Sequence, residues 1–452
     1  MSIAQRNDAC KQAVAPSGPD GEFRGWGRCT GGGMCGILAT MQNFLQGRLL
    51  LVRTCLLVSV LALVLIGILT IYAVGNPLET SPATKTAALA GYWKKQLLFA
   101  ILGGGCFVAA NLVNYRRLGA VSAWIYAVVL LLLAYLLVSR YVMTLPFAPG
   151  RNNVHRWIVF HPRLPQLQPS EFCKVAYILA LAWYLRYRSN YRRFRALIAP
   201  FAVTLLPMML ILPEPNLGTV LLMMPILFTM LFVAGAQVKH LALIALLAVV
   251  FSPGLWLTMR SYQRARISGV VLQSEWVRQK AETYPLVSKV LVGGKFSERR
   301  WRSDWGYHLV RSKFAVASGG LAGHGFGHGP FLKYNFLDER HNDFIFSAIA
   351  HQWGFLGCVG LLGIYLLLAA CGLEIAAHNT DPFARLLAVG LVAMFVVEVV
   401  VNVGMTLGLM PITGLTLPFV SYGGSSLLVN MTAVGLLNNV GRHRPFSVAP
   451  KT

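Results

Sequence analysis

Two charged residues stand three positions apart at the start of an apolar stretch. They are Glu171 and Lys174 in the run QPSEFCK, in which Ser170 can cap a helix. Residues with this spacing project from one face of a helix, and charges at membrane depth are costly unless they are paired or functional. One interpretation is a structural ion pair, with the lysine snorkelling towards water. The other is a cation placed to meet a phosphate.

Asp343 stands at the start of a second, longer apolar stretch, shortly after Arg340 and His341. A carboxylate at that position is expected near the membrane interface, partly removed from water. Two roles suit it. It could cap the helix, or it could act as a general base, because a positioned carboxylate can accept the proton of an attacking hydroxyl.

A third acidic residue, Glu398, lies inside an apolar stretch, with Asn402 one helical turn later. A carboxylate within a membrane span is a functional candidate by default. A proton relay and a hydrogen bond inside a helix bundle explain this residue equally well.

Two glycine-rich segments could bring backbone N–H groups close to a ligand. SGGLAGHGFGHG covers Ser318–Gly329, and GLTLPFVSYGGSSL, Gly414–Leu427, contains Ser421, Gly423 and Gly424. Glycine lets a backbone approach an anion, but a lone glycine-rich loop is a weak signal. Small residues also permit close helix packing, so both interpretations of the second segment stay open.

The elements that carry these residues are predicted to be membrane helices. The chain has 452 residues, is 56% hydrophobic and only 12% charged, and has a mean hydropathy of +0.59, whereas soluble domains carry about 25% charged residues. The net charge of +24 fits basic residues that flank spans and meet anionic lipid headgroups, and it does not favour nucleic acid as a partner. Ten apolar segments predict an all-α polytopic membrane protein: 54–75, 96–113, 119–139, 170–185, 196–212, 217–235, 240–259, 343–371, 384–408 and 419–440.

An even number of spans places both termini on one side of the membrane. Arginines concentrate in the second, fourth and later even connections, so the positive-inside rule predicts cytoplasmic termini. Residues 1–47 are expected to be a disordered cytoplasmic extension, 48–444 the membrane domain and 445–452 a cytoplasmic tail. The long segment 260–342 is then extracytoplasmic, and its part 271–296 is expected to form short amphipathic helices on the headgroup layer.

Several motifs, in order along residues 50–444, resemble the SEDS family of RodA and FtsW, the polytopic enzymes of bacterial cell-wall synthesis. The ERH before the aspartate and the run GMTLGLMPITG are more similar to RodA. The motifs are GRNNVHRWI followed by QPSEFCK, EPNLGT at 214–219, SYQRARI at 261–267, GYHLVRSKFAVASGG at 306–320, ERHNDFIF at 339–346 and GMTLGLMPITGLTLPFVSYGGSSLL at 404–428.

The resemblance implies a ten-span, GT-C-like glycosyltransferase in the bacterial inner membrane. Such an enzyme polymerises lipid II into glycan strands beside a class B penicillin-binding protein. The motifs shared with RodA favour a role in rod-shape elongation over one in division. Carried over by position, Asp343 matches the family's essential acidic residue, Glu171 and Lys174 match the charged turn of its fourth span, and Trp157 matches the tryptophan of its first outer loop.

The sequence also departs from the family pattern at several positions. Asn216 stands where the family usually has Asp, and Asn342 where it has Thr. His324 replaces a common Lys, and His351-Gln352 replaces a usual Glu-Glu pair. The segment 268–304 is longer than the family pattern and matches it poorly.

The reaction implied by the resemblance needs a base and a cation. The 4-hydroxyl of a lipid-linked disaccharide attacks the anomeric carbon of a growing strand and expels undecaprenyl diphosphate with inversion. Asp343 is the expected base. Lys174, Arg156, Arg340 and a divalent cation, Mg²⁺ or Mn²⁺, are the candidates for neutralising the leaving group. The alternatives are a lipid II flippase or transporter, with Glu398 coupling protons, and a non-catalytic cell-wall scaffold.

Overall fold

The computed structural model describes residues 49–77, 91–143, 145–150, 155–159, 166–187, 194–214, 216–303, 306–334, 336 and 340–442, without the side chains of Leu255 and Tyr262. The extensions expected at 1–47 and 445–452 lie outside the described residues. Within that part, the regular elements are helices, and one isolated bridge joins Ile158 to Leu167. The predicted all-α class is therefore confirmed.

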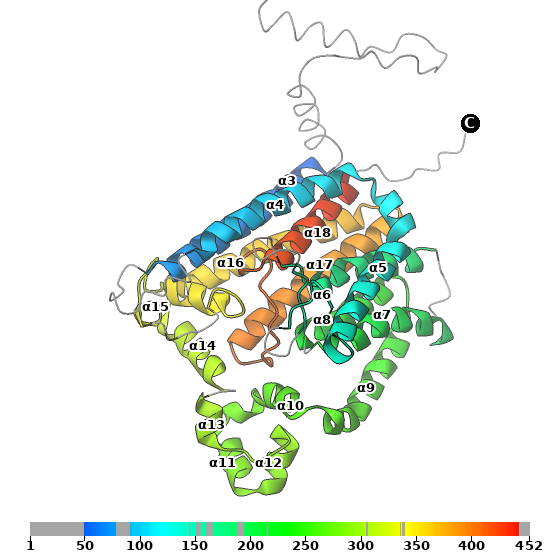
Figure 1. Cartoon of the computed structure of the whole chain (residues 1–452). Coiled ribbons are helices and arrows are strands. Elements are labelled where there is room, and N and C mark those ends of the chain that lie inside the picture. Colours follow the sequence, from blue (N-terminus) through cyan, green and yellow to red (C-terminus); the bar gives the residue numbers. More distant parts are fainter. Residues whose placement is uncertain are drawn as a thin grey trace, which may run out of the picture. The chain divides into compact units, whose positions relative to one another are not determined.

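Each of the ten predicted apolar segments coincides with a helix (Figure 1). Among the described residues, six helices are long and apolar enough to cross a membrane: α3, α4, α5, the continuous pair η3 and α7, α16 and α17. The full count of ten spans stays a prediction. The helices are α3 (Leu50–Gly75), α4 (Tyr92–Leu112), α5 (Tyr115–Tyr141), α6 (Pro169–Leu185), η3 (Phe194–Leu197), α7 (Ile198–Ile211), α8 (Leu217–Val233), α9 (Val238–Thr258), α16 (Ile345–Ala377), α17 (Pro382–Thr406) and α18 (Gly424–Arg442).

Local sequence explains where the important helices begin. Pro169 opens α6, at a position where a missing N–H costs nothing. The Asn216 side chain accepts a hydrogen bond from the Thr219 N–H and so caps α8. The last predicted span, 419–440, begins later than expected, at Gly424. Phe419 has a φ of 66° that no α-helix accommodates, and the Tyr422 N–H donates to the His341 carbonyl instead of to a helical partner.

Helix α16 is broken near its start. Gly354 has a φ of 64°, and a Cβ there would lie 2.4 Å from the Gly323 N–H nitrogen. The glycine-rich segment 319–325 therefore packs directly against the break, which only glycine permits. The predicted span 343–371 is in fact a helix that begins at Ile345 and runs on to Ala377.

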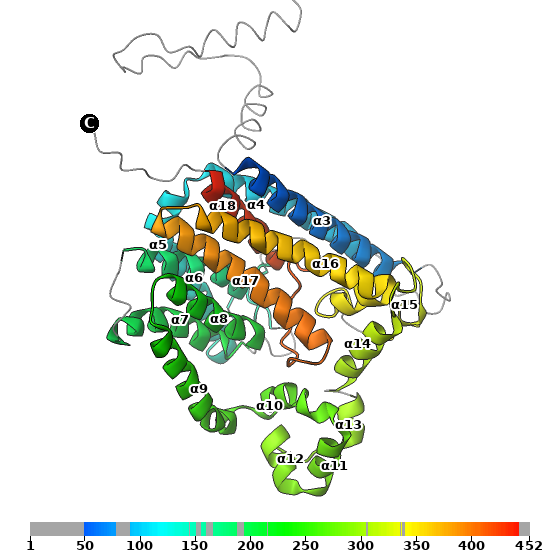
Figure 2. The ribbon, with the colours of Figure 1, turned by 180° about the vertical axis from the view of Figure 1, so that it is seen from behind.

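Helix α17 forms the centre of the bundle. It is the most buried of the six long helices, and Figures 1 and 2 show it between α16 on one side and α6 and α8 on the other. Large apolar side chains on the peripheral helices stay exposed, such as Leu61, Leu131 and Leu366. Such extensive apolar surface is expected where a helix meets lipid. The chain is a multi-pass membrane protein.

The predicted short helices over 271–296 are confirmed. After α9, residues 260–303 form what we call the connecting unit, which comprises α10 (Ser261–Ser268), η4 (Val271–Gln273), α11 (Glu275–Thr283), α12 (Pro285–Val292) and α13 (Glu298–Ser303). Its own small core contains Ala265, Leu272, Ala281, Val292, Phe296 and Trp301. Helices α14 (Tyr307–Ser318) and α15 (Pro330–Lys333) then lead back to α16.

Candidate active site

The turn that carries Asp343 is fixed by three successive hydrogen bonds. The backbone carbonyls of residues 341–343 accept, in order, from the Tyr422 N–H at 2.9 Å, the Ser421 hydroxyl at 2.8 Å and the Asn402 side-chain amide at 3.0 Å. Two of these donors come from the segment between α17 and α18, and the third from α17 itself. A backbone held at three consecutive positions sets the origin and direction of the Asp343 side chain.

The Asp343 carboxylate lies beside Gly414. A Cβ added to Gly414 would come within 3.5 Å of Asp343 Oδ2, and Gly414 has a φ of 75°. The aspartate itself is half-buried. The acid is therefore held next to a backbone stretch without a side chain, where a hydroxyl could come within hydrogen-bond reach of the carboxylate.

The predicted small residues beside Asp343 mostly pack the protein against itself. The Ser421 hydroxyl also accepts from the Leu417 N–H at 2.8 Å, and the Gly423 N–H donates to Gln96 Oε1 at 3.4 Å. A Cβ on Gly424 would lie 2.8 Å from the ring of Phe99. Close packing thus accounts for Gly424, whereas a ligand role for these residues remains a prediction.

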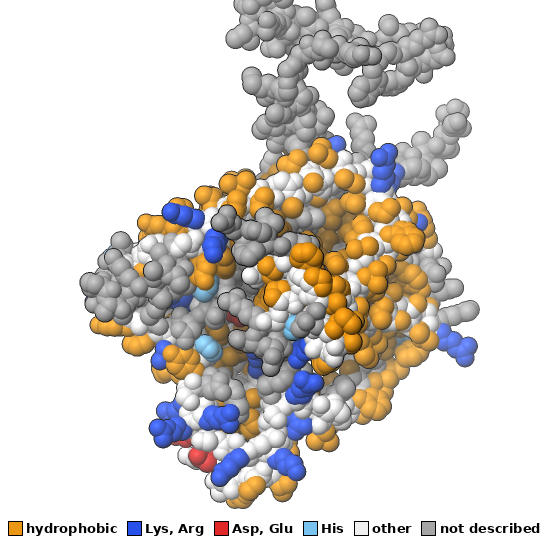
Figure 3. Space-filling view, in the orientation of Figure 1, with side chains coloured by type: hydrophobic (Ala, Val, Ile, Leu, Met, Phe, Trp, Pro, Cys, Tyr) orange, Lys and Arg blue, Asp and Glu red, His pale blue; other side chains and the backbone are white. Residues whose placement is uncertain are grey.

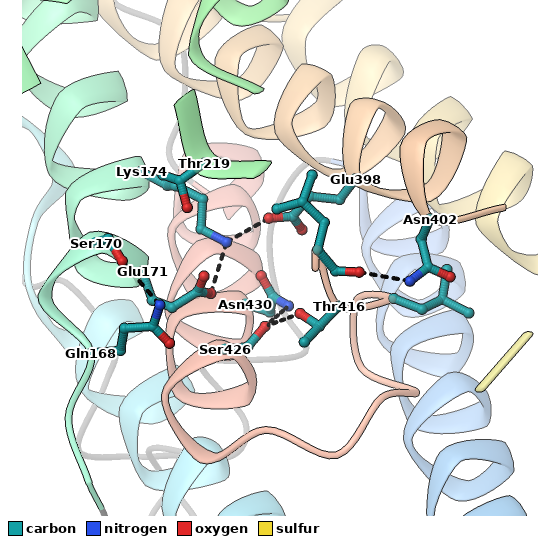
Figure 4. A network of polar contacts seen from close by, with 12 residues as sticks. Gln168, Ser170, Glu171, Lys174, Thr219, Glu398, Asn402, Thr416, Ser426 and Asn430 are labelled. Atoms are coloured by element: carbon teal, nitrogen blue, oxygen red, sulfur yellow. Dashed lines mark hydrogen bonds and ion pairs between the residues drawn. The ribbon is translucent and has the colours of Figure 1, made fainter. Parts of the chain in front are cut away.

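Glu171 and Lys174 form the predicted ion pair, and a third residue joins them. Lys174 Nζ lies 2.7 Å from Glu171 Oε2 and 2.6 Å from Glu398 Oε1 (Figure 4). The side chains of Lys174, Glu171 and Glu398 are 0%, 10% and 1% exposed. The lysine therefore does not snorkel, and its ammonium group is shared by two buried carboxylates. We call these three residues the ion cluster.

Helix α17 links the ion cluster to Asp343. Glu398 and Asn402 lie one turn apart on this helix, and the first holds Lys174 while the second holds the Asp343 carbonyl. The Asn402 amide also donates to the Leu415 carbonyl at 2.7 Å. The ion cluster and the Asp343 turn, which the sequence suggested separately, are thus held by neighbouring turns of one buried helix.

Asn216 connects α8 to α6, the helix that carries Glu171 and Lys174. Its amide donates to the Ser170 hydroxyl at 3.0 Å, while its carbonyl oxygen caps α8. The Gln168 side chain donates to the same hydroxyl at 3.1 Å. An aspartate, the usual residue here in the SEDS resemblance, could cap α8 but, when ionised, could not donate to Ser170.

His351 and Gln352, which both lie on α16, hold the glycine-rich segment 318–329 against this helix. His351 Nδ1 lies 2.8 Å from the Ser318 hydroxyl, and Gln352 Oε1 accepts from the Gly327 N–H at 3.1 Å. A Cβ on Gly329 would lie 2.2 Å from His351 Nε2. Close packing therefore explains glycines in this segment.

The remaining predicted cations and the tryptophan lie on two different segments. Arg156 Nε donates to the Glu214 carbonyl, so this guanidinium is directed towards the turn after α7. Trp157 is half-buried next to the Ile158 bridge, and Arg340 is 3% exposed in the turn that carries Asp343. The structure thus places Arg340, but not Arg156, in the same turn as the acid.

Glu214, which opens the EPNLGT motif but was not among the predicted site residues, is 1% exposed. Among the described residues, neither carboxylate oxygen has a hydrogen-bond partner. Burial raises the pKa of Glu214 to about 8, against the opposing effect of Arg156 and Arg140. The signal available in the sequence was a lone carboxylate in an otherwise apolar turn.

A protein-held metal is not supported by the side chains that the structure describes. In this part of the chain no three His, Cys, Asp or Glu side chains gather into a ligand set. Mg²⁺ is often held by one or two carboxylates together with substrate phosphates, so a divalent cation here would depend on oxygens of the substrate.

Comparison with known proteins places the chain in a family. The model of the FtsW, RodA and SpoVE family, described as a cell cycle protein, matches residues 53–445. The chain belongs to this family. The predicted resemblance to RodA and FtsW is confirmed.

Relatives in the FtsW, RodA and SpoVE family carry peptidoglycan glycosyltransferase names. RodA of Treponema pallidum is 33% identical over 436 residues, covering 85% of this chain and 96% of that protein. The peptidoglycan glycosyltransferase MrdB of Escherichia coli K12 is 33% identical over 299 residues, covering 66% and 74%. The probable peptidoglycan glycosyltransferase FtsW of Trichlorobacter lovleyi is 32% identical over 393 residues, covering 85% and 92%.

Solved structures of the same family share the fold. A chain from "Structural coordination of polymerization and crosslinking by a peptidoglycan synthase complex" is 30% identical with a TM-score of 0.65, covering 86% of this chain and 96% of that one. RodA of Thermus thermophilus is 29% identical with a TM-score of 0.57, covering 86% and 97%.

Proposed function

We propose that this protein is a peptidoglycan glycosyltransferase that polymerises lipid II into glycan strands during rod-shape elongation. The proposal rests on membership of the FtsW, RodA and SpoVE family, and RodA of Treponema pallidum is among the relatives. The observation that carries it in the structure is Asp343, a half-buried carboxylate whose backbone is held by three successive hydrogen bonds.

Asp343 acts as the general base in this proposal. Its carboxylate accepts the proton of the acceptor's 4-hydroxyl while that oxygen forms a bond to the anomeric carbon of the growing strand. The bond from that carbon to undecaprenyl diphosphate breaks, and the configuration inverts. A positioned base typically contributes about 10²- to 10⁴-fold.

The developing charge on the diphosphate requires cations. Arg340 is the leading candidate because it shares a turn with Asp343, and Arg156 and Trp157 contribute from the outer loop between α5 and α6. Lys174 and Glu171, expected from the resemblance to bind substrate, take a positioning role in this proposal, because the buried ammonium group faces two carboxylates and fixes α6 against α17. Ser421 supports the site through its hydroxyl, which donates to the Asn342 carbonyl beside Asp343, and Gly423 and Gly424 follow in the same segment.

The proposed setting is the bacterial inner membrane, with both termini in the cytoplasm. The likeness to a chain of a peptidoglycan synthase complex supports a second protein as partner. We take this partner to be a class B penicillin-binding protein, which crosslinks the strands that this enzyme makes.

The test is lipid II polymerisation by the purified protein, with and without its partner. Asp343→Asn preserves shape and removes the proton acceptor, so the variant is expected to fold and bind its partner while glycan synthesis falls about 10²-fold or more. Glu282→Gln, at an exposed position on α11, removes one carboxylate away from the site and is the matched control.

Polymerisation by Asp343→Asn within a few-fold of the unmodified protein would refute the base assignment. Movement of lipid II across vesicle membranes without glycan synthesis would favour the flippase alternative. A cell that elongates normally with Asp343→Asn as its only copy would favour the scaffold.

A further inference from the structure

A pocket of about 810 Å³ lies between the connecting unit and α14, away from Asp343. Five cationic side chains line it, and one carboxylate, that of Glu298, lies close to them. The cations are Arg278, Arg299, Arg302, Arg311 and Lys313.

Within the described residues, a single carboxylate pairs with two of these five cations. Glu298 lies 2.8 Å from the Arg302 guanidinium and 3.4 Å from that of Arg278. Among the residues that the structure describes, Arg299, Arg311 and Lys313 have no carboxylate partner. Three guanidinium or ammonium groups around one opening favour a ligand with a phosphate group.

The pocket also has an apolar wall. Phe314 is 62% exposed and lines it together with Val310 and Tyr307, all on one face of α14. The opposite face of the helix, which carries Leu309, is buried. A soluble anion gains nothing from an exposed phenyl ring, whereas the acyl part of a lipid does.

Helix α14 separates this pocket from the proposed active site. On its buried side, Ser312 lies 2.6 Å from the Ser347 hydroxyl, and Ala315 packs with Phe344, the residue after Asp343. The pocket uses the other side of the same helix, so it is a second site and not an extension of the first.

The connecting unit is held at the end of a predicted span. The Trp256 ring N–H of α9 donates to the Val290 carbonyl of α12 at 2.7 Å, and Arg264 donates to the Leu257 carbonyl at 2.7 Å. Leu286 on α12 is 78% exposed. Figure 3 shows Lys and Arg side chains gathered over this part of the molecule. Cations beside exposed apolar groups, directly after a span, are typical of a segment at the headgroup layer.

We propose that this pocket binds the phosphate of an anionic phospholipid, with the lipid's apolar part against Phe314. Arg299 and Lys313 are exposed and contact the phosphate together with Arg311; Lys313 now donates to Gln273 Oε1 at 2.9 Å, and Arg311 donates to the Phe336 carbonyl. The proposal does not depend on the glycosyltransferase activity.

The experiment measures lipid binding by the full-length protein in detergent, by native mass spectrometry with phosphatidylglycerol or phosphatidylcholine. The unmodified protein should prefer phosphatidylglycerol. The variant Arg299→Gln/Lys313→Gln should weaken that binding about 10-fold or more, because two cations near the phosphate are lost. The control Lys289→Gln/Lys295→Gln removes two exposed cations of the same unit that do not line the pocket, and should change binding less than twofold.

Three results would overturn the proposal. Equal loss in both double variants would mean a diffuse surface charge instead of a site. Millimolar inorganic phosphate that displaces the lipid completely would make the site one for a free anion. Binding of a hexaglutamate peptide, with no preference between the two lipids, would assign the pocket to an acidic polypeptide.

Discussion

Replacing Lys174 by Met removes the one cation of the ion cluster while keeping the length of the side chain. Glu171 and Glu398 would then face each other across the bundle, with side chains only 10% and 1% exposed. Breaking a buried pair by removing one partner typically costs about 3–5 kcal/mol, because the remaining charge is left uncompensated. We expect a loss of that size, which is a large fraction of a typical domain's free energy of unfolding.

A second substitution should restore part of the stability lost in Lys174→Met. Glu398→Gln removes one of the two carboxylates that share Lys174, so the double variant Lys174→Met/Glu398→Gln should be more stable than Lys174→Met alone. The assay is thermal unfolding in detergent for both single variants and the double variant, followed by lipid II polymerisation. A coupling energy of about 1–3 kcal/mol between the two positions is expected for residues in direct contact. Lys239→Met, at an exposed position on α9, is the control for losing a lysine.

The result that would refute this reasoning is a Lys174→Met protein that unfolds at the unmodified temperature but no longer makes glycan strands. The ion cluster would then contribute nothing measurable to stability. Lys174 would have to meet the substrate diphosphate directly, which requires that it leaves both carboxylates when substrate binds.

Three further predictions concern other parts of the molecule. Burial raises the pKa of Glu214 to about 8 from its ordinary 4.5, so the folded protein keeps a proton that the unfolded chain releases between these values. The free energy of unfolding should therefore fall as pH rises from about 5 to 8, by up to about 3 kcal/mol at pH 7, and Glu214→Gln should flatten this slope in melting curves; an unchanged slope would contradict it. Asn216→Asp should lower the melting temperature by an amount equivalent to about 1 kcal/mol, because it places a carboxylate at a position that is 8% exposed and removes one of the two amides that donate to Ser170; an equal or higher temperature would count against this role of Asn216. Cysteines introduced at positions 190 and 300 should react with an impermeant thiol reagent in intact cells only at 300, and labelling at 190 would reverse the predicted topology.

The sequence could predict the membrane helices because a span needs about 20 apolar residues, and that signal is local. It could also predict the pairing of Glu171 with Lys174, since three positions along a helix bring side chains together. It mistook where the last span begins, because the φ of Phe419 depends on the packing of the whole segment before α18 and not on apolar content.

The contacts between residues far apart along the chain could not be predicted from the sequence. Glu398 and Lys174 are 224 positions apart, and Asn402 reaches the Asp343 carbonyl across 59. Hydropathy predicts that α17 is a span, but α5 has the same hydropathy and is far less buried, so hydropathy tells neither that α17 is central nor which neighbours its polar residues meet. For Glu398, the sequence therefore supported a proton relay and a hydrogen bond inside the bundle equally well. The structure shows this residue paired with Lys174.

The arrangement of α17 has a mechanical consequence for the proposed base. Glu398 is tied to α6 through Lys174, and Asn402, one turn later, is tied to the Asp343 carbonyl and to the Leu415 carbonyl beside Gly414. A shift of α6 along α17 would therefore strain the same helix that holds the acid and the glycine next to it. Because buried polar contacts of this kind have few alternative arrangements, α6 and the Asp343 turn should move together or not at all. If Asp343 is the base as proposed, the ion cluster would influence catalysis by fixing where Asp343 stands, without any atom of the cluster touching the substrate.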